Sequence, residues 1–216
     1  MRAISIVSLV LILSASAPAD IVTYNYSQPT TTTNWTETFA VQQFNPALGT
    51  LNSVTLNLDG DLSQTFQFEN LDGPGTITFS NGLTTGCMFE LEYSGGSNLL
   101  LLDIENTPTY AFDDFDGNID FTGTSGNTDT VGVIDSFFDV FTDVPTLSAF
   151  TGTGTIDLDA IATGRSYYEA TSGNIIVGVM TTAGADVSVT YDYTIPEPAT
   201  IGLLALGSAA LIRRKR

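Results

Sequence analysis

Asp114, Asp116, Asn118 and Asp120 place an oxygen-bearing side chain at every second position of one short segment. Carboxylate and amide oxygens are the ligands that Ca²⁺ takes in proteins. Alternate residues of an extended segment point to the same side, so these four side chains could line one edge of a loop. The segment is therefore a candidate calcium site, and the sequence predicts no other cofactor.

The spacing of this acidic segment differs from that of an EF-hand. With Asp114 as position 1, the sixth residue is Ile119 and the twelfth is Ser125, where an EF-hand loop has Gly and Glu. The alternative is a turn with solvated acids that enters a strand at Ile119. Phe115 and Phe121 would then point inward.

The composition excludes several classes of catalytic site. The chain has no histidine, which removes His-based triads, and a single cysteine, which nearly removes zinc chemistry. Phe121-Thr122-Gly123 and Phe150-Thr151-Gly152 have phenylalanine where an aspartic protease motif has its acid. A glycosidase needs two facing carboxylates, and no pair stands out. We therefore expect no catalysis and name no catalytic residue.

Two single residues have more than one interpretation. Cys87 is a buried hydrophobe, a reactive thiol or a partner for a cysteine of another chain. Trp35 is either a stacking platform for sugar or a core residue. The second interpretation of Trp35 is favoured by its spacing from Phe39 and Val41, which predicts a common inward face.

The charge is strongly negative, with 24 acidic and 6 basic residues and a formal net charge of −18. Between Ile21 and Thr194 there are 22 acidic residues and one basic residue, Arg165, which gives −21. Such a domain is not a nucleic-acid binder, because phosphate contacts need a basic surface. Its carboxylates must be solvated, hydrogen-bonded or neutralised by cations.

Residues 1–19 have the pattern of a secretory signal peptide. Arg2 precedes the apolar run Ala3–Leu13, which is too short to span a membrane, and small residues follow it. Ala17 and Ala19 fit an A-x-A cleavage site with the cut before Asp20. We expect a signal helix here and export of the chain.

Residues 195–216 form a second processing signal. Pro196-Glu197-Pro198 is followed by a run that is apolar or small throughout, from residue 199 to 212, and then by Arg213, Arg214 and two further basic residues. As a helix, the run would be about 21 Å long, which is short of the roughly 30 Å hydrocarbon core. A plain tail anchor is the alternative interpretation.

This tripartite C-terminus resembles the PEP-CTERM sorting signal of Gram-negative bacteria. The resemblance implies processing by an exosortase, after transient anchoring in the inner membrane, and delivery to the envelope, outer surface or extracellular matrix. The implied partners are the exosortase and the export machinery.

The region 21–194 predicts one all-β domain. Apolar and polar residues alternate along residues 53–58, 65–68, 88–93 and 186–194, as in half-buried antiparallel strands. Leu99–Ile104 is apolar enough to suggest a central strand covered on both faces. Turn-forming clusters, including Asp59-Gly60-Asp61, separate these segments. The nearest helical candidate, Pro145–Phe150, is long enough for a single turn. We expect an antiparallel, jelly-roll-like β-sandwich.

The body is also similar to the choice-of-anchor E domain, a bacterial surface family whose members differ in their C-terminal anchor. The similarity rests on blocks at residues 34–39, 44–51, 115–121, 147–156 and 182–191. It implies an exported, anchored β-domain and adds no catalytic residue and no ligand.

Three functions follow from these features, in order of preference. The first is a structural or adhesive protein of the cell surface or matrix, with contacts to acidic exopolysaccharide bridged by calcium. The second is a carbohydrate-binding module for exopolysaccharide, and the third is a carboxylate-based glycoside hydrolase.

Overall fold

The computed structural model describes residues 19–78, 85–170 and 174–196, and it is all-β with antiparallel sheets. The described part contains one short helix, α1 (Val144–Ala149), between β8 and β9. Its first turn is capped by Asp143, whose carboxylate accepts the Thr146 amide at 3.0 Å. The single helical turn predicted at Pro145–Phe150 is thus confirmed. The strands are β1 (Ala19–Thr32), β2 (Trp35–Gln42), β3 (Thr50–Asn70), β4 (Gly75–Thr78), β5 (Thr85–Tyr93), β6 (Ser97–Asn106), β7 (Thr109–Phe112), β8 (Gly126–Phe141), β9 (Thr155–Arg165), β10 (Glu169–Ala170) and β11 (Ile175–Thr194).

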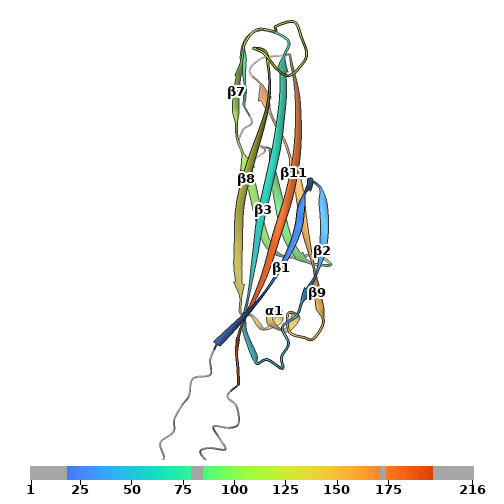
Figure 1. Cartoon of the computed structure of the whole chain (residues 1–216), viewed down its shortest axis with the longest axis vertical. Coiled ribbons are helices and arrows are strands. Elements are labelled where there is room, and N and C mark those ends of the chain that lie inside the picture. The colour runs from blue at the N-terminus through green and yellow to red at the C-terminus, as the bar shows by residue number, and fades with distance from the viewer. Residues whose placement is uncertain (1–18, 79–84, 171–173, 197–216) are drawn as a thin grey trace, which may run out of the picture.

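The first layer is a long four-stranded sheet in the order β1-β11-β3-β8 (Figure 1). β3 and β11 pair along almost their whole length, from Thr50 opposite Thr194 to Asn70 opposite Ile175. Strands of 20 and 21 residues extend roughly 65 Å at about 3.3 Å per residue. This sheet therefore defines the long axis of the molecule.

The second layer consists of two shorter sheets, β2-β9-β5-β6 and β10-β4-β7. β3 contributes to the core beneath each of them. Leu56 and Leu58 belong to the larger core cluster, with residues from β2, β5, β6 and β9. Phe66 and Phe68 form the smaller cluster with Phe112 of β7. The inward face of β3 thus passes from one core to the other within a few residues.

Two predictions about individual strands are wrong. Asp59-Gly60-Asp61 is no turn, because it lies inside β3 and continues its alternation, with Gly60 facing the core. Leu99–Ile104 belongs to β6, an edge strand covered on one face, and Leu101 on the other face is 51% exposed. The all-β prediction is confirmed, whereas the jelly-roll-like sandwich stays a prediction.

Both ends of the described chain lie at one end of the long axis, which we call the proximal pole (Figure 1). Ala19 pairs with Thr194 across β1 and β11, and Tyr193 donates its hydroxyl to the Asp20 carboxylate at 3.1 Å. The opposite end, the distal pole, carries the junction of β3 with the loop Asp113–Ser125. The predicted signal helix and C-terminal helix lie outside the described residues. Within the described part no helix has the length and apolar character needed to cross a membrane.

Candidate functional site

The distal loop, Asp113–Ser125, is organised around a carboxylate that the sequence analysis missed. Glu69, at the end of β3, is completely buried. Its Oε2 accepts the amides of Phe121 at 2.7 Å and Asp120 at 3.2 Å, and its Oε1 accepts the Ser125 hydroxyl at 2.6 Å. Three donors around one carboxylate compensate for its removal from water.

The neighbouring residue, Asn70, ties the distal loop to the turn that follows β3. Asn70 is also fully buried, and its Nδ2 lies within 2.9 Å of the carbonyl oxygens of Asp72, Gly73 and Asp113. Its Oδ1 accepts the Asp72 amide at 3.1 Å. Glu69 and Asn70 therefore fix the distal pole from inside, and neither is free to hold a ligand.

The four predicted calcium ligands all lie in this loop and are all exposed. Two of them bond to their own turn: Asp116 Oδ1 accepts the Asn118 amide at 3.0 Å, and Asp120 Oδ1 accepts the amide and hydroxyl of Thr122 at 3.0 and 2.7 Å. The other two predicted ligands are Asp114 and Asn118. Among the described residues, no three acidic, His or Cys side chains gather closely enough to hold a metal ion. Calcium binding at this loop stays a prediction.

The alternative interpretation of this segment is right about the exposed acids and wrong about a strand beginning at Ile119. Ile119 is 57% exposed and Phe115 is 37% exposed, and neither residue lies in a strand. Phe121 has φ +57°, a left-handed conformation that is uncommon for a residue with a bulky side chain. The hydrogen bond from its backbone amide to the Glu69 carboxylate helps to hold it there. The loop curls over the Glu69 carboxylate instead of extending past it.

A second candidate site is a hollow of about 230 Å³ on the outer face of the long sheet. Asp59 of β3 and Asp186 of β11 lie directly opposite each other there, and Asp61 follows on the same face of β3. Like charges opposite each other weaken strand pairing. Asn57 partly compensates, donating Nδ2 to Asp59 at 2.9 Å, and Thr30 donates to Asp61 at 3.4 Å. We call this site the outer-face hollow.

The outer-face hollow combines hydrogen-bond acceptors with apolar walls. Ser27 and Gln28 add polar groups, while Pro29 and Ile134 add apolar surface. Such a lining can accept hydrogen bonds from a hydroxyl-rich ligand. Sequence reasoning missed it because Asp59-Gly60-Asp61 was interpreted as a turn, and because Asp186 comes from a strand far away in the chain.

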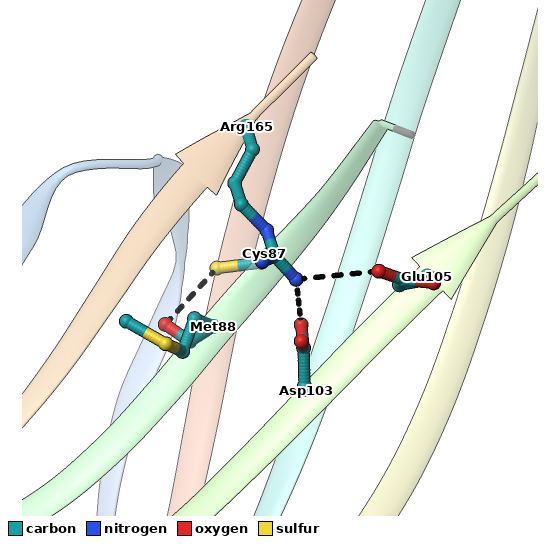
Figure 2. Close-up of polar contacts among 5 residues, drawn as sticks. All are labelled: Cys87, Met88, Asp103, Glu105 and Arg165. Atoms are coloured by element: carbon teal, nitrogen blue, oxygen red, sulfur yellow. Dashed lines mark hydrogen bonds and ion pairs between the residues drawn. The ribbon is translucent and has the colours of Figure 1, made fainter. Parts of the chain in front are cut away.

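Arg165, the lone basic residue between Ile21 and Thr194, forms a structural ion pair (Figure 2). Its guanidinium contacts Asp103 and lies 3.6 Å from Glu105, both on β6. Gly86 of β5 pairs with Arg165 on one side and Glu105 on the other, so the arginine side chain can cross a strand position that lacks a side chain. The pair links β9 to β6 across β5.

Cys87 lies beside this ion pair, and its side chain is completely buried. Burial raises the pKa of its thiol to about 12, which outweighs the opposing effect of Arg165. The thiol lies 3.8 Å from the Met88 carbonyl oxygen. A thiol with so high a pKa is no nucleophile at neutral pH, so the interpretation as a small buried hydrophobe is confirmed.

Trp35 is a core residue, as its spacing predicts. It is half-buried against the larger core cluster, and Phe39 and Val41 on the same strand are buried. Its indole Nε1 donates to the Ala183 carbonyl at 3.1 Å, which links β2 to β11 across the two layers. The tryptophan is therefore not available as an open platform for sugar stacking.

The residues of the two processing signals lie mostly outside the described part. Ala17, Glu197, Pro198, Arg213 and Arg214 are not described, whereas Ala19 opens β1 and Pro196 ends the described chain. Ile195 packs against the larger core cluster. The folded part therefore reaches up to the start of the sorting motif.

Comparison with known proteins identifies the C-terminal signal and little else. Residues 194–216 match the PEP-CTERM protein-sorting motif. The motif indicates exosortase-dependent export and association with the bacterial cell envelope or surface. No curated protein matches the chain.

Solved structures with some similarity to the chain include structures of infectious bursal disease virus and its particles. The Gx strain structure is 10% identical with a TM-score of 0.22, covering 88% of this chain and 41% of that one. The T13 viral particle is 12% identical with a TM-score of 0.22, covering 96% and 51%. The chain thus spans about half or less of these proteins, and scores this low support no structural argument.

Proposed function

We propose that this protein is a non-catalytic structural or adhesive component of the cell surface or extracellular matrix of a Gram-negative bacterium. The observation that carries the proposal is the pairing of Ala19 with Thr194 at the proximal pole. It places the expected signal-peptide cleavage site and the start of the sorting motif side by side. A domain held there would present its distal loop roughly 65 Å away.

The absence of catalysis is part of this proposal. The single thiol, that of Cys87, is buried and protonated, and no acids among the described residues gather into a metal site. Asp59 and Asp186 do face each other, which is the minimum a carboxylate-based glycosidase requires. Incubation of the protein with its host's exopolysaccharide tests this: release of reducing ends that Asp59→Asn abolishes would overturn the non-catalytic assignment.

The experiment that tests the surface assignment compares the wild-type chain with one truncated after Ile195. In its own host, the wild-type protein is expected in the surface or matrix fraction, anchored transiently in the inner membrane before processing. The truncated chain is expected in the medium or periplasm. Equal distribution of the two proteins would contradict sorting through this signal.

Carbohydrate binding is the second candidate, and the outer-face hollow favours it. The charge bears instead on the adhesive role of the first candidate. A body with −21 formal charge repels an acidic polysaccharide unless divalent cations bridge the two. We propose that calcium does so, with Asp114, Asp116, Asn118 and Asp120 as the first residues to test. Co-sedimentation of the exported protein with exopolysaccharide, performed once in calcium and once in chelator, separates calcium-bridged contact from direct sugar recognition.

Each result of that experiment has a definite meaning. Binding that requires calcium and is lost in Asp116→Asn supports cation bridging through the distal loop. Binding that survives chelator but is lost in Asp59→Asn supports direct sugar recognition in the outer-face hollow. Absence of binding in both conditions removes the exopolysaccharide partner and leaves the surface assignment intact.

A further inference from the structure

β8 forms one edge of the long sheet (Figure 1). Along its second half, residues on both of its faces are exposed. All seven residues from 134 to 140 are exposed. Four of them are apolar, with exposed fractions of 77% for Ile134, 45% for Phe137, 63% for Phe138 and 48% for Val140. An apolar strand at the edge of a sheet is a template for pairing with another strand.

The opposite edge of the same sheet is protected, whereas β8 is not. β1 contains Pro29, and its pairing with β11 shifts register between Gln28 and Thr31, which interrupts a regular edge. β8 contains no proline and pairs with β3 without a shift from Gly126 to Phe141. Its other side pairs with no strand among the residues that the structure describes, although β6 of the second layer lies close to β8.

Aspartates on β8 identify which backbone groups face this open side. The carboxylates of Asp135 and Asp139 accept the amides of Ser136 and Val140 at 2.8 and 2.7 Å. A side chain can reach these amides because they point away from β3. Even-numbered residues of this segment therefore present their backbone groups to an incoming strand, and the two aspartates compete with that strand for the donors.

The side-chain pattern of β8 is complementary to itself about Ser136. A second copy, antiparallel and related by a two-fold axis at Ser136, places Ile134 opposite Phe138 of the second copy on the outer face. On the inner face, Asp135 then lies opposite Phe137 of the second copy. Apolar residues meet on one face, and each acid meets an apolar residue on the other.

The two adjacent registers bring like charges together. An axis at Phe137 sets Asp135 opposite Asp139 of the second copy, and an axis at Asp135 sets that residue opposite itself. Like charges directly opposite each other destabilise strand pairing. The correspondence about Ser136 is a property of β8 with its own copy, and it is the argument for a second copy as the occupant of this edge.

We propose that two copies of this chain associate through β8, antiparallel about Ser136, to form one continuous sheet. This interface is independent of the surface function proposed above. Both copies are strongly acidic, so their repulsion opposes association and salt screening favours it. Dimer formation also requires Asp135 and Asp139 to release the amides that they cap.

Cross-linking the exported protein tests both the interface and its register. Ser136→Cys places two thiols at the two-fold axis, where paired Cα atoms lie about 5.5 Å apart, within the range of a disulfide. Thr130→Cys is the matched control, because Thr130 is exposed on the same face of the same strand but lies opposite position 142 of the second copy. Wild-type Cys87 is buried and does not interfere.

We expect oxidation to convert most Ser136→Cys protein to a covalent dimer at raised ionic strength and little of the Thr130→Cys protein. Equal cross-linking of the two variants, no dimer for Ser136→Cys, or a disulfide to a different protein would each overturn the proposal. A second variant, Ser136→Pro, removes an amide that faces the open side, so the monomer should tolerate it. By light scattering it should be a monomer where the wild type is a dimer, and a dimeric Ser136→Pro protein would also overturn the proposal.

Discussion

The ring of Phe89 on β5 lies directly against the backbone of Gly60 on β3. A Cβ atom on Gly60 would lie 2.8 Å from Phe89 Cε2 and 3.0 Å from the Ile104 Cδ1 methyl. Gly60 faces the core in the middle of a 21-residue strand, where a glycine would ordinarily weaken the sheet. Here it makes the space into which the ring from the opposite layer packs.

Gly60→Ala is therefore expected to destabilise the fold by about 1–3 kcal/mol, as overpacking of a core does. Phe89→Leu should lower stability by itself, but the double variant should lose less than the sum of the two, because the smaller side chain relieves the clash. Urea unfolding of the four proteins measures this coupling. Gly132→Ala, with its new Cβ 3.9 Å from the nearest atom, is the control and should change little.

Removal of one acceptor at Glu69 should loosen the distal loop. Glu69→Gln weakens the charge-assisted bonds to the amides of Asp120 and Phe121, each of which contributes about 1.5–3 kcal/mol. Hydrogen exchange at these two amides should accelerate well beyond any change in the β3–β11 ladder. Glu37→Gln, at an exposed position, is the control, and unchanged exchange in Glu69→Gln would show that the loop does not depend on this carboxylate.

Gln64 lies on the inward face of β3 between the two core clusters. It is completely buried, and its side-chain amide has no hydrogen-bond partner in the described part of the chain. An unsatisfied buried amide costs about 1–3 kcal/mol. Gln64→Met should therefore raise the urea midpoint, whereas Gln67→Met on the exposed face of the same strand should not. A lower midpoint for Gln64→Met would mean that the amide has a partner.

The pKa of Cys87 predicts an unreactive thiol and a loss of stability at alkaline pH. Burial raises this pKa to about 12, above the value of 9.0 for an exposed thiol. Ionisation therefore favours the unfolded chain, so stability contributed by the neutral thiol is present below pH 9 and is lost between pH 9 and 12. Maleimide should label the folded protein at pH 8 much more slowly than the protein in urea. Equal labelling rates for the folded protein and the protein in urea would contradict the burial of the Cys87 thiol.

The sequence predicted the strand faces better than the strand lengths. Alternation on both sides of Asp59-Gly60-Asp61 placed the core residues of β3 correctly, but composition alone suggested a turn there. The packing of Phe89 against Gly60 comes from a strand distant in sequence, so no local pattern reveals it. Similarly, Leu99–Ile104 is apolar on both faces, although one face of β6 is exposed.

The candidate sites were predicted only in part. The acidic side chains of the distal loop were recognised from their types, but their organiser, Glu69, comes from the end of β3. No sequence signal marked Glu69, because the consecutive burial of Phe68, Glu69 and Asn70 at the end of β3 is seen only in the structure. The outer-face hollow and the self-complementary edge of β8 depend on strand order, which the sequence does not specify.

The most direct test of the surface assignment is labelling of intact cells with a bulky, membrane-impermeant maleimide. Asn118→Cys reports on the distal loop, and Leu48→Cys reports on the proximal pole, where the neighbouring Gly49 lies close to Thr194 and Ile195. Both side chains are exposed, so the two variants should react equally once extracted. On cells, Asn118→Cys should be labelled much faster than Leu48→Cys. Equal labelling of the two on cells, or no labelling of either, would contradict a domain held at its proximal pole on the cell surface.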